Sequence, residues 1–381
     1  MLFILASFVV LNLLYAIGII YLYIGMNKAR KSNMATVEDD NLLPEVTVII
    51  PARDESSNIA GIIEDLKTQD YPEGKCFFTI IDDFSSDDTY RKAMELIGGD
   101  ERFRLFRLAE DDEYLASTNL SAKKRVVDFG VKNADTEIVL FTDADCRMGR
   151  RWVRSMASQF QDQNSITAGF VGYRYNSLFK AVLALEALAN RIIASGAIGW
   201  GEAVTCAAAN WGYRKSLYNR LGGLEKFADS LSGDDTLFLQ TAVKNGARAV
   251  YNFNPDSFVY TTESGGLGEV IMRRIRRLGI ARSFNWNIML FSALLLYYGW
   301  LMVAVVPFLS VSDPYWLYIL IAGWMFKWIF EFWIIAKGAG LFRSRNLIKF
   351  TPLASVYHAL VITIVGTASL IFRGSWKGRA I

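Results

Sequence analysis

Long apolar stretches at both ends of the chain constrain its fold most strongly, because such segments must leave water. Residues 1–26, MLFILASFVVLNLLYAIGIIYLYIGM, contain no charged side chain, and a helix of about 20 apolar residues crosses the ~30 Å hydrocarbon core of a bilayer. Residues 286–309, 315–336 and 353–372 are similarly apolar. The sequence therefore predicts a protein with membrane-spanning helices on both sides of a more polar central segment.

The charges beside the first apolar stretch indicate its orientation. Lys28, Arg30 and Lys31 follow it directly, and an excess of Lys and Arg marks the cytoplasmic side of a span. A cleaved signal peptide is the alternative, disfavoured because no basic residue precedes the apolar core and no small-residue cleavage site follows it. We expect a multi-pass protein of the inner (plasma) membrane, with residues 1–27 as the N-terminal anchor and 28–44 as a linker.

The C-terminal membrane region, residues 286–373, is predicted to contain two to three spans followed by a tail at 374–381. The basic loop between the last two apolar segments, with Lys337, Arg343, Arg345 and Lys349, marks the cytoplasmic side. Four full crossings in the whole chain would place the basic tail outside, against the charge rule. Either one C-terminal segment is re-entrant or the rule fails here.

Several individual side chains, and the net charge, also bear on function. Lys327 and Glu331 lie four residues apart in an apolar segment, so they can pair on one helix face, which we favour over a substrate role. The sequence contains a single histidine, His358, which we interpret as a packed polar residue. Because there is only one, histidine catalysis and a histidine-rich zinc site are not expected. The three cysteines have no C-x-x-C spacing and suggest free thiols in a reducing compartment. A net charge of +3 gives no indication of nucleic-acid binding.

Residues 45–265 show the pattern of an α/β domain. Apolar runs at 46–50, 77–83, 102–108 and 138–141 predict strands, and residues 58–67 and 121–132 have helical periodicity. Strands that alternate with helices predict a mostly parallel sheet, whose ligands bind at the carboxyl ends of the strands. Acidic clusters stand at these ends, whereas the acidic stretch AEDDEY at 109–114 is predicted to be a solvated loop.

The strand at 138–141 runs into Asp143 and Asp145, a D-x-D pair. In an extended backbone both side chains point the same way. Two carboxylates aimed at one point suit a hard divalent cation such as Mg²⁺ or Mn²⁺, which usually shares its remaining positions with substrate phosphates. The pair alone is a weak signal and gains weight from the other acidic clusters.

Two further segments suggest contact with lipid. Residues 266–285 carry arginines on an apolar repeat, the composition of a basic helix lying on an anionic membrane surface, with a solvated helix packed on the domain as the alternative. Residues 178–210 are unusually apolar and rich in small residues. They either line an acceptor cleft facing the bilayer or form an ordinary buried helix.

Six motifs occur in an order and spacing that resemble a known family. VTVIIPARDE, IIDDFSSDDT, the Lys123-Lys124 pair, FTDADC, CAAANWGYRK and SGDDTLFL follow the pattern of family 2 glycosyltransferases with a GT-A fold over residues 45–283. The flanking apolar segments and the WKGR tail also resemble the membrane-embedded bacterial branch. The resemblance implies an α/β, Rossmann-like catalytic domain that binds a nucleotide-sugar donor.

The resemblance also implies the donor and metal residues. In PARDE, Pro51, Ala52, Arg53 and Glu55 would contact the donor; Asp82 and Asp83 would bind the nucleoside, a carboxylate accepting the uracil imide N–H, with a helix cap as the alternative reading. Lys124, or its neighbour Lys123, would face the diphosphate, together with Arg276. Asp143 and Asp145 would hold Mn²⁺ or Mg²⁺, with Asp145 the preferred ligand.

The family's catalytic base corresponds to Asp235, with Asp234 shaping the local field; helix capping is again the alternative. Processive members carry Q-x-x-R-W, where this chain has Arg273, Arg276 and Arg277, so the tryptophan that stacks a growing polymer is missing. The resemblance implies an inverting, metal-dependent transfer from a UDP-sugar to a lipid or lipid-linked acceptor at the cytoplasmic face. The alternatives are a processive polysaccharide synthase that exports its product, a nucleotidyltransferase and a nucleotide-sugar receptor.

Overall fold

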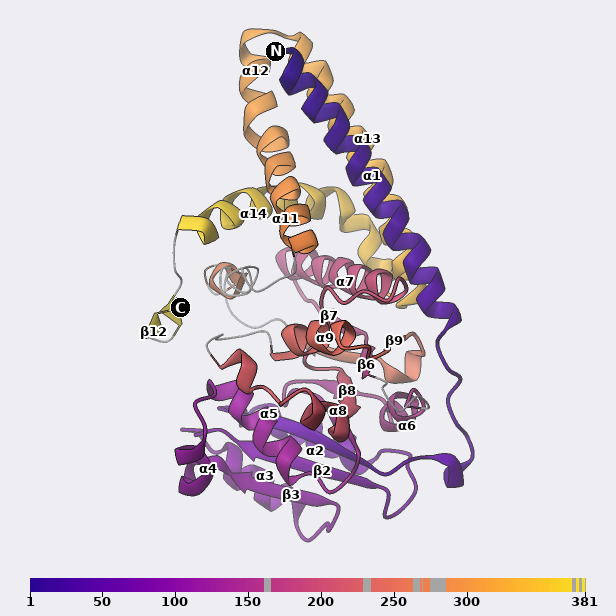
Figure 1. Cartoon of the computed structure of the whole chain (residues 1–381), viewed down its shortest axis with the longest axis vertical. Coiled ribbons are helices and arrows are strands. Elements are labelled where there is room, and N and C mark those ends of the chain that lie inside the picture. The colour runs from indigo at the N-terminus through magenta and orange to yellow at the C-terminus, as the bar shows by residue number, and fades with distance from the viewer. Residues whose placement is uncertain are drawn as a thin grey trace. The chain divides into compact units, whose positions relative to one another are not determined.

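Alternating strands and helices form the central part of the chain (Figure 1). The computed structural model describes residues 1–160, 166–228, 234–262, 268, 270–274, 286–371, 375–376 and 379–380. The chain divides into two units. One, the α/β unit, comprises Gly25–Arg174 and Ile193–Thr262; the other, the helical unit, comprises Met1–Ile24, Tyr175–Ile192 and Glu263–Ile381.

Seven strands among the described residues form the main sheet of the α/β unit. They are β1 (Val46–Ala52), β2 (Cys76–Asp82), β3 (Phe103–Arg107), β4 (Ile138–Phe141), β6 (Ile166–Gly169), β8 (Trp211–Arg214) and β9 (Ala249–Asn252). Their order is β3-β2-β1-β4-β8-β6-β9. All neighbours pair in parallel except β8, which runs antiparallel to both β4 and β6. The prediction of a mostly parallel sheet is confirmed.

A smaller sheet carries the strands that follow the D-x-D motif. Its described strands are β5 (Arg147–Met148), β7 (Val171–Arg174) and β10 (Val259–Thr262), in the order β5-β10-β7. Strand β10 pairs antiparallel with β5 and parallel with β7. Strand β5, which directly follows the D-x-D motif, therefore pairs with β10 at the end of the α/β unit.

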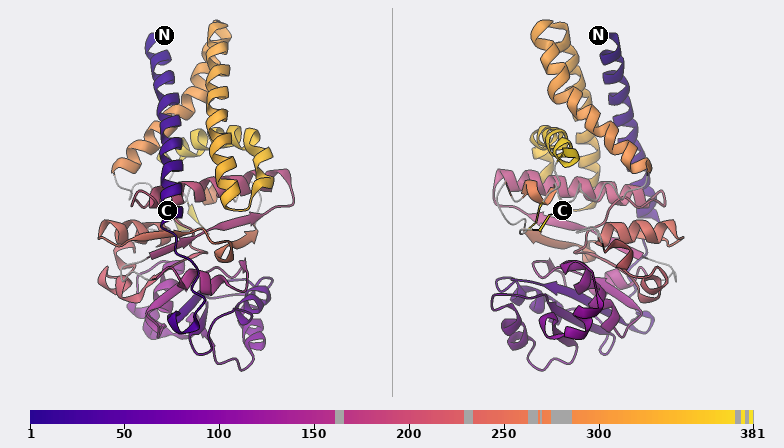
Figure 2. Two further views of the ribbon diagram at one scale, coloured as in Figure 1. Left: turned by 90° about the vertical axis from the view of Figure 1, so that its right-hand side faces the viewer. Right: turned by 60° about the vertical axis from the view of Figure 1, so that its left-hand side comes forward.

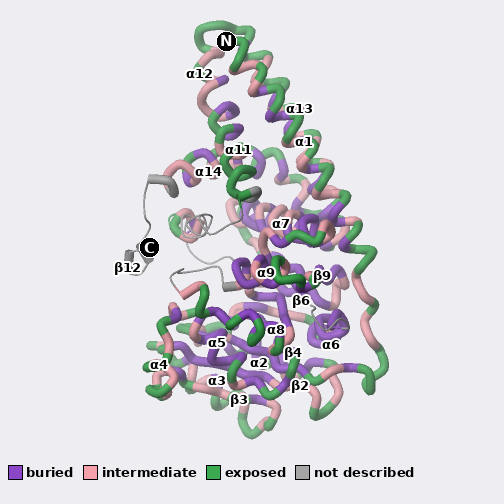
Figure 3. The backbone as a smooth tube through the Cα atoms, in the orientation of Figure 1, coloured by how far each residue is buried: buried purple, intermediate pink, exposed green. Residues whose placement is uncertain are grey.

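The central strands are buried on both faces, which explains their continuous apolar sequences. Val46, Val48, Ile49 and Ile50 of β1 have no exposed surface, and Figure 3 shows the same for much of the sheet. The helices of this unit are α2 (Ile59–Lys67), α3 (Thr89–Ile97), α4 (Asp112–Ser117), α5 (Ala122–Asn133), α6 (Trp152–Ala157), α8 (Lys215–Arg220) and α9 (Asp234–Lys244), with short 3₁₀ turns at Asp40–Leu42, Leu108–Glu110, Glu225–Phe227 and Pro255–Ser257.

The acidic stretch at 109–114 is not the loop that the sequence predicts. It contributes to the 3₁₀ turn at Leu108–Glu110 and begins α4. The Asp111 carboxylate accepts a hydrogen bond from the Tyr114 amide at 2.9 Å, a helix cap. The Tyr114 hydroxyl in turn donates to the buried Asp128 of α5 at 2.9 Å. The prediction of a loop was wrong because the acidic residues begin a helix here and Tyr114 anchors it, whereas Glu110, Asp112 and Glu113 are exposed to solvent as expected.

The helical unit contains the apolar segments predicted to span a membrane (Figure 2). Its helices are α11 (Trp286–Trp300), α12 (Val306–Ser312), α13 (Tyr315–Leu341) and α14 (Thr351–Ile371), with a π-helical turn at Leu301–Val305 and a 3₁₀ turn at Arg345–Phe350. The two-residue strands β11 (Ser375–Trp376) and β12 (Arg379–Ala380) lie in the tail. Helix α1 (Leu2–Lys31) continues into the α/β unit after Ile24. Phe8 and Leu11 of α1 pack with Tyr298 and Trp316 in one apolar cluster.

Five helices among the described residues are long and apolar enough to cross a membrane: Leu2–Lys31, Leu178–Ile198, Met289–Ser312, Tyr315–Leu341 and Arg345–Ala368. Four match the predicted spans. The fifth is α7 (Leu178–Ile198), of which 72% of the apolar window is buried by protein, against 22% to 33% for the others. This burial agrees with the buried-helix reading of residues 178–210.

Lys327 and Glu331 of α13 form the ion pair that their spacing predicts, with Lys327 Nζ 2.5 Å from Glu331 Oε1. Lys327 also donates to Ser355 Oγ of α14 at 2.7 Å, and the Tyr15 hydroxyl of α1 donates to Glu331 Oε1 at 2.5 Å. Charged groups are tolerated at membrane depth when they neutralise each other in this way. The pair therefore links three helices of the helical unit.

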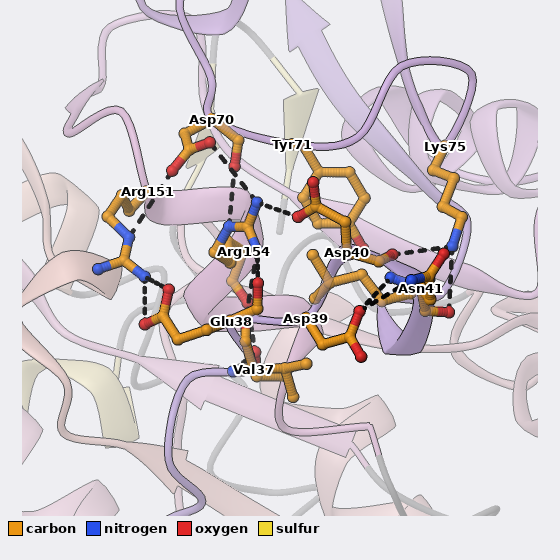
Figure 4. A network of polar contacts seen from close by, with 12 residues as sticks. Val37, Glu38, Asp39, Asp40, Asn41, Asp70, Tyr71, Lys75, Arg151 and Arg154 are labelled. Carbon is orange, nitrogen blue, oxygen red and sulfur yellow. Dashed lines mark hydrogen bonds and ion pairs between the residues drawn. The ribbon is translucent and has the colours of Figure 1, made fainter.

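The segment expected to be a linker is fastened to the α/β unit (Figure 4). Arg154 of α6 donates to the carbonyls of Val37 and Glu38 at 3.2 and 3.3 Å and pairs with Asp40 at 2.7 Å. Arg151 pairs with Glu38 at 2.5 Å. Because the Arg154 side chain is only 6% exposed, its hydrogen bonds are shielded from water and fix the path of residues 34–43.

Arg154→Met is expected to lower the free energy of unfolding of the α/β unit by about 2–3 kcal/mol, because the backbone carbonyls of Val37 and Glu38 lose a charged donor that is itself buried. Arg150→Met is the matched control, since Arg150 is exposed and donates to one carbonyl, that of Thr68. Thermal unfolding in detergent and limited proteolysis of residues 34–43 measure both effects. Equal stability of the two variants would contradict the role assigned to Arg154.

Candidate active site

Three neighbouring parallel strands end at one edge of the main sheet. Strand β1 lies between β2 and β4, with Ala52 opposite Asp82 and Ile49 opposite Phe141. The carboxyl ends of these strands therefore carry three of the predicted segments side by side: 51–55 after β1, 82–83 after β2 and 143–145 after β4. Pro51 and Ala52 are still part of β1.

The loops after β1 and β2 are joined by hydrogen bonds. Asp54 accepts from the Ser86 amide at 2.7 Å, the Glu55 amide donates to the Thr89 hydroxyl at 2.7 Å, and the Ser56 amide donates to Asp87 at 3.1 Å. Hydrogen bonds from Thr89 and Ser56 lower the pKa of Asp87 to about 2, so this carboxylate stays ionised near neutral pH. These hydrogen bonds join the loop after β1 to the loop after β2.

The paired aspartates that end β2 are both buried. Asp82 Oδ2 accepts from the Ser85 amide at 3.3 Å, while Oδ1 has no hydrogen-bond partner among the residues that the structure describes. Asp83 Oδ1 accepts from Arg125 Nη2 at 2.6 Å and Nε at 3.1 Å, and Oδ2 lies 3.5 Å from Arg53 Nη1. The sequence interpretation missed Arg125, although it directly follows the Lys123-Lys124 pair.

The D-x-D motif adopts a turn rather than the extended backbone that the sequence suggests, closed by the Cys146 amide donating to the Asp143 carbonyl at 3.1 Å. Asp143 pairs with Lys123 at 3.0 Å, and Asp145 Oδ2 accepts from the Thr261 hydroxyl of β10 at 2.8 Å. Thr261 was not predicted as a site residue. The two carboxylates are therefore fixed by different elements instead of by the alternation of a strand.

Electrostatics place Glu55 in the same acidic environment. Burial and the neighbouring Asp143 raise the pKa of Asp145. Burial, followed by the charges of Asp145 and Asp143, also raises the pKa of Glu55. A nearby cation would stabilise the charged forms of Glu55 and Asp145.

The oxygen ligands at this edge fit Mg²⁺ or Mn²⁺ bound together with a phosphate ligand. The described residues contain no group of three or more acidic, histidine or cysteine side chains placed to hold a metal alone. Asp143 and Asp145 offer two carboxylates, and Mg²⁺ is usually bound by one or two carboxylates plus substrate phosphates and water. This composition fits a cation that arrives with a diphosphate.

The structure distinguishes the two lysines by their surroundings. Lys124 is fully buried, and its ammonium donates to the Phe227 carbonyl. Lys123, with 44% of its side chain exposed, is the one that pairs with Asp143. Successive residues of a helix point in different directions, and Lys123 is the one whose ion pair with a D-x-D carboxylate the structure shows.

Asp234 and Asp235 begin helix α9. The Asp235 carboxylate accepts a hydrogen bond from the Thr236 amide at 2.6 Å, and acidic residues in a first turn favour the helix dipole. Lys124 fixes Phe227, which precedes α9, to helix α5 beside Lys123. Arg276 lies outside the described residues.

The sheet order and the strand-end position of the acidic segments define a GT-A type of fold, the nucleotide-binding architecture of many sugar transferases. Residues 47–222 match the family model of glycosyl transferase family 2. The family resemblance of the motif series is thereby confirmed.

Two known proteins show how far the similarity extends. Glycosyltransferase AglE of Haloferax volcanii is 27% identical over 135 residues, which are 35% of this chain and 41% of that protein. The structure of the mannosyltransferase PcManGT from Pyrobaculum calidifontis, in complex with GDP-Man and Mn²⁺, aligns with a TM-score of 0.58 at 17% identity, covering 96% of this chain and 99% of that one. The second similarity shows that the fold is shared along almost the whole chain.

Proposed function

We propose that this chain is an inverting, metal-dependent glycosyltransferase that moves a sugar from a nucleotide donor, a UDP-sugar, to a lipid or lipid-linked acceptor at the cytoplasmic face of the inner membrane. The observation that carries the proposal is the convergence of residues 51–55, 82–83 and 143–145 at the ends of three adjacent parallel strands. Ligands of open α/β sheets bind at this edge.

In the proposed donor site, these segments contact successive parts of the donor, first the nucleoside and then the diphosphate. Asp82, Asp83, Arg53 and Arg125 face the nucleoside, and Asp143, Asp145 and Lys123 face the diphosphate. Mn²⁺ or Mg²⁺, when bound, would stabilise the charge that develops on the leaving nucleoside diphosphate. Arg276 remains a proposed diphosphate contact from its position in the sequence.

Asp235 is the proposed general base. An acceptor hydroxyl oxygen forms the new bond to the anomeric carbon while the bond from that carbon to the diphosphate breaks, and the hydroxyl proton passes to the Asp235 carboxylate. Attack from the face opposite the leaving group inverts the anomeric configuration. Asp234 is proposed to influence this step only through its charge.

The membrane location is supported by the apolar helices at both ends. A lipid acceptor would present its hydroxyl or phosphate at the membrane surface, where a membrane-anchored enzyme can meet it. The cytoplasmic side is proposed from Lys28, Arg30 and Lys31 after the first span. The chain has Arg277 where processive relatives carry tryptophan, so we propose a single transfer rather than polymer synthesis.

A donor screen with Mn²⁺ and extracted membrane lipids tests this proposal. We expect release of a nucleoside diphosphate together with a lipid heavier by one sugar residue. Release of pyrophosphate would identify a nucleotidyltransferase instead, and long polymer would identify a processive synthase. Nucleotide-sugar binding without any product would indicate a receptor.

The two lysines provide a matched test of the donor site. Lys123→Ala is expected to raise the KM for the donor roughly tenfold with little change in stability, because a half-exposed cation near the diphosphate is lost. Lys124→Ala is expected to lower the free energy of unfolding by about 2–3 kcal/mol, because the Phe227 carbonyl loses a charged donor that is fully buried. Donor kinetics and thermal unfolding of both variants measure the difference, and the reverse pattern would exclude Lys123 from the site.

A further inference from the structure

Helix α14 contacts both arms of a helical hairpin. One arm consists of α11 and α12, the other is α13, and the chain turns between them at Asp313. Trp300 at the end of α11 donates from Nε1 to Thr367 Oγ1 of α14 at 3.1 Å. On the other arm, Lys327 Nζ donates to Ser355 Oγ of α14 at 2.7 Å. Two hydrogen bonds from separate helices therefore fix the direction of α14.

These two contacts lie at the same level of the hairpin. Trp300 and Lys327 are each about 13 residues from the turn, so ~20 Å of helix separates either of them from it. Their partners Thr367 and Ser355 are about 12 residues apart, which is ~18 Å along α14. A helix running alongside the hairpin would approach the turn by that distance between the two contacts. Helix α14 instead runs across α11 and α13, as Figures 1 and 2 show.

The turn and the base of the hairpin differ in charge. Between residues 283 and 326 the only charged side chain is that of Asp313. Basic residues begin about ten residues, or ~15 Å, beyond Lys327 and continue to residue 349. The basic end of α1 lies on the same side, because Tyr23 of α1 packs on Trp333 of α13 with ring centres 4.6 Å apart. The level of α14 is therefore nearer to the basic base of the hairpin than to its turn.

The exposed surface of α14 is apolar. Among the residues of this helix whose burial the structure describes, the exposed ones are Pro352, Leu353, Val356, Leu360 and Ile364. The last four follow one face of the helix. No Asp, Glu, Lys or Arg occurs between residues 350 and 372. A helix lying on the headgroups presents a charged face to water, so the exposed stripe of α14 fits acyl chains better than an aqueous surface.

We propose that α14 lies parallel to the membrane surface within the cytoplasmic leaflet, with its apolar stripe against acyl chains, and does not cross the bilayer. The proposal rests on the proposed membrane location and specifies how the C-terminal region lies in the bilayer. Among the described helices, α1, the arm formed by α11 and α12, and α13 are then the ones that cross. The tail, with Arg373, Lys377 and Arg379, returns to the side of the basic loop, as the charge rule requires.

Labelling of single added cysteines from either side of the membrane tests this path. The three native cysteines are buried, so the unmodified chain provides the background. Asp313→Cys at the turn, Lys349→Cys in the basic loop and Ala380→Cys in the tail are treated with a membrane-impermeant maleimide in right-side-out and in inverted vesicles. We expect Lys349→Cys and Ala380→Cys to react at least about tenfold faster in inverted vesicles, and Asp313→Cys to show the opposite preference.

The position of the tail relative to the basic loop decides the proposal. Reaction of Ala380→Cys from the same side as Asp313→Cys would show that α14 crosses the bilayer and would overturn it. Reaction of Lys349→Cys and Ala380→Cys together in right-side-out vesicles would support the path of α14 and contradict the proposed cytoplasmic face. Failure of the inference and failure of the proposed orientation are therefore distinguishable.

Spin labels test the direction of α14 within the bilayer. Leu353→Cys and Ile364→Cys place labels at exposed positions about 11 residues, or ~16 Å, apart along the helix. Ile321→Cys and Phe332→Cys of α13 are the matched control, exposed and equally spaced. Relaxation by oxygen and by a water-soluble nickel complex should place the α14 labels within about 5 Å of each other in depth and the α13 labels more than about 10 Å apart. Equal depth differences in the two pairs would overturn the proposal.

Discussion

Asp145→Ala is expected to reduce sugar transfer by at least about 10³-fold and to abolish the dependence of donor binding on Mn²⁺. Asp145 is the better fixed of the two D-x-D carboxylates, held by the Thr261 hydroxyl at 2.8 Å. Loss of a metal ligand removes stabilisation of the departing diphosphate, which supplies much of the rate in this type of reaction. Initial rates at a series of donor and Mn²⁺ concentrations measure the effect.

Two further variants separate metal binding from folding. Asp145→Asn retains the shape of the side chain and should be as inactive as Asp145→Ala, because a neutral amide is a poor ligand for a hard cation. Asp135→Ala removes an exposed acid that pairs with Arg104 and should leave the rate unchanged. Mn²⁺-dependent turnover within about tenfold of the parental rate in Asp145→Ala would show that the D-x-D pair does not hold the cation.

Asp235→Asn is expected to lower kcat by roughly 10³-fold while the affinity for UDP changes by less than about twofold. A proposed base acts on the acceptor hydroxyl and not on the donor, so its loss should affect the chemical step alone. Single-turnover rates measure the chemical step, and UDP calorimetry on the same preparation measures the affinity for UDP. Loss of one charge from the first turn of α9 costs at most about 1 kcal/mol, so the variant should remain folded.

Asp234→Asn is the matched variant for this prediction, because both acids begin the same helix. It should retain more than about a tenth of the parental kcat if Asp234 acts only through its charge. Equal losses in the two variants would indicate a structural role at the start of α9. Near-parental turnover in Asp235→Asn would show that another group removes the proton.

The central strands β1 and β4 could be predicted because burial on both faces leaves mainly apolar residues, whereas β6, β8 and β9 were not predicted. Val46 to Ile50 and Ile138 to Phe141 read as continuous apolar runs, and both became central strands. The placement of acids at their carboxyl ends agrees with the rule that ligands of parallel sheets bind there, whereas the strand order was not predicted. The reversal of β8 was not predicted, since strand direction depends on partners far along the sequence.

Side-chain direction at the site was less predictable. Lys123 and Lys124 are identical in type and adjacent, and only the packing of α5 against the Phe227 segment decides which one reaches Asp143. The D-x-D turn depends on hydrogen bonds closed by Cys146 and Thr261. These partners lie outside the motif, so the motif alone suggested an extended backbone.

The ordered path of residues 34–43 was also missed. The sequence there is polar and resembles a linker, yet its backbone carbonyls accept hydrogen bonds from Arg154, more than 100 residues later. An arginine inside a helix gives no sequence signal for the carbonyls that it will meet.

Titration of UDP into the purified full-length chain, with Mn²⁺ and again with EDTA, tests most directly whether the acidic segments after β1, β2 and β4 form one nucleotide and cation site. We predict micromolar binding with Mn²⁺ and affinity at least about tenfold weaker with EDTA. Equal binding in both conditions, or none in either, would contradict a shared site.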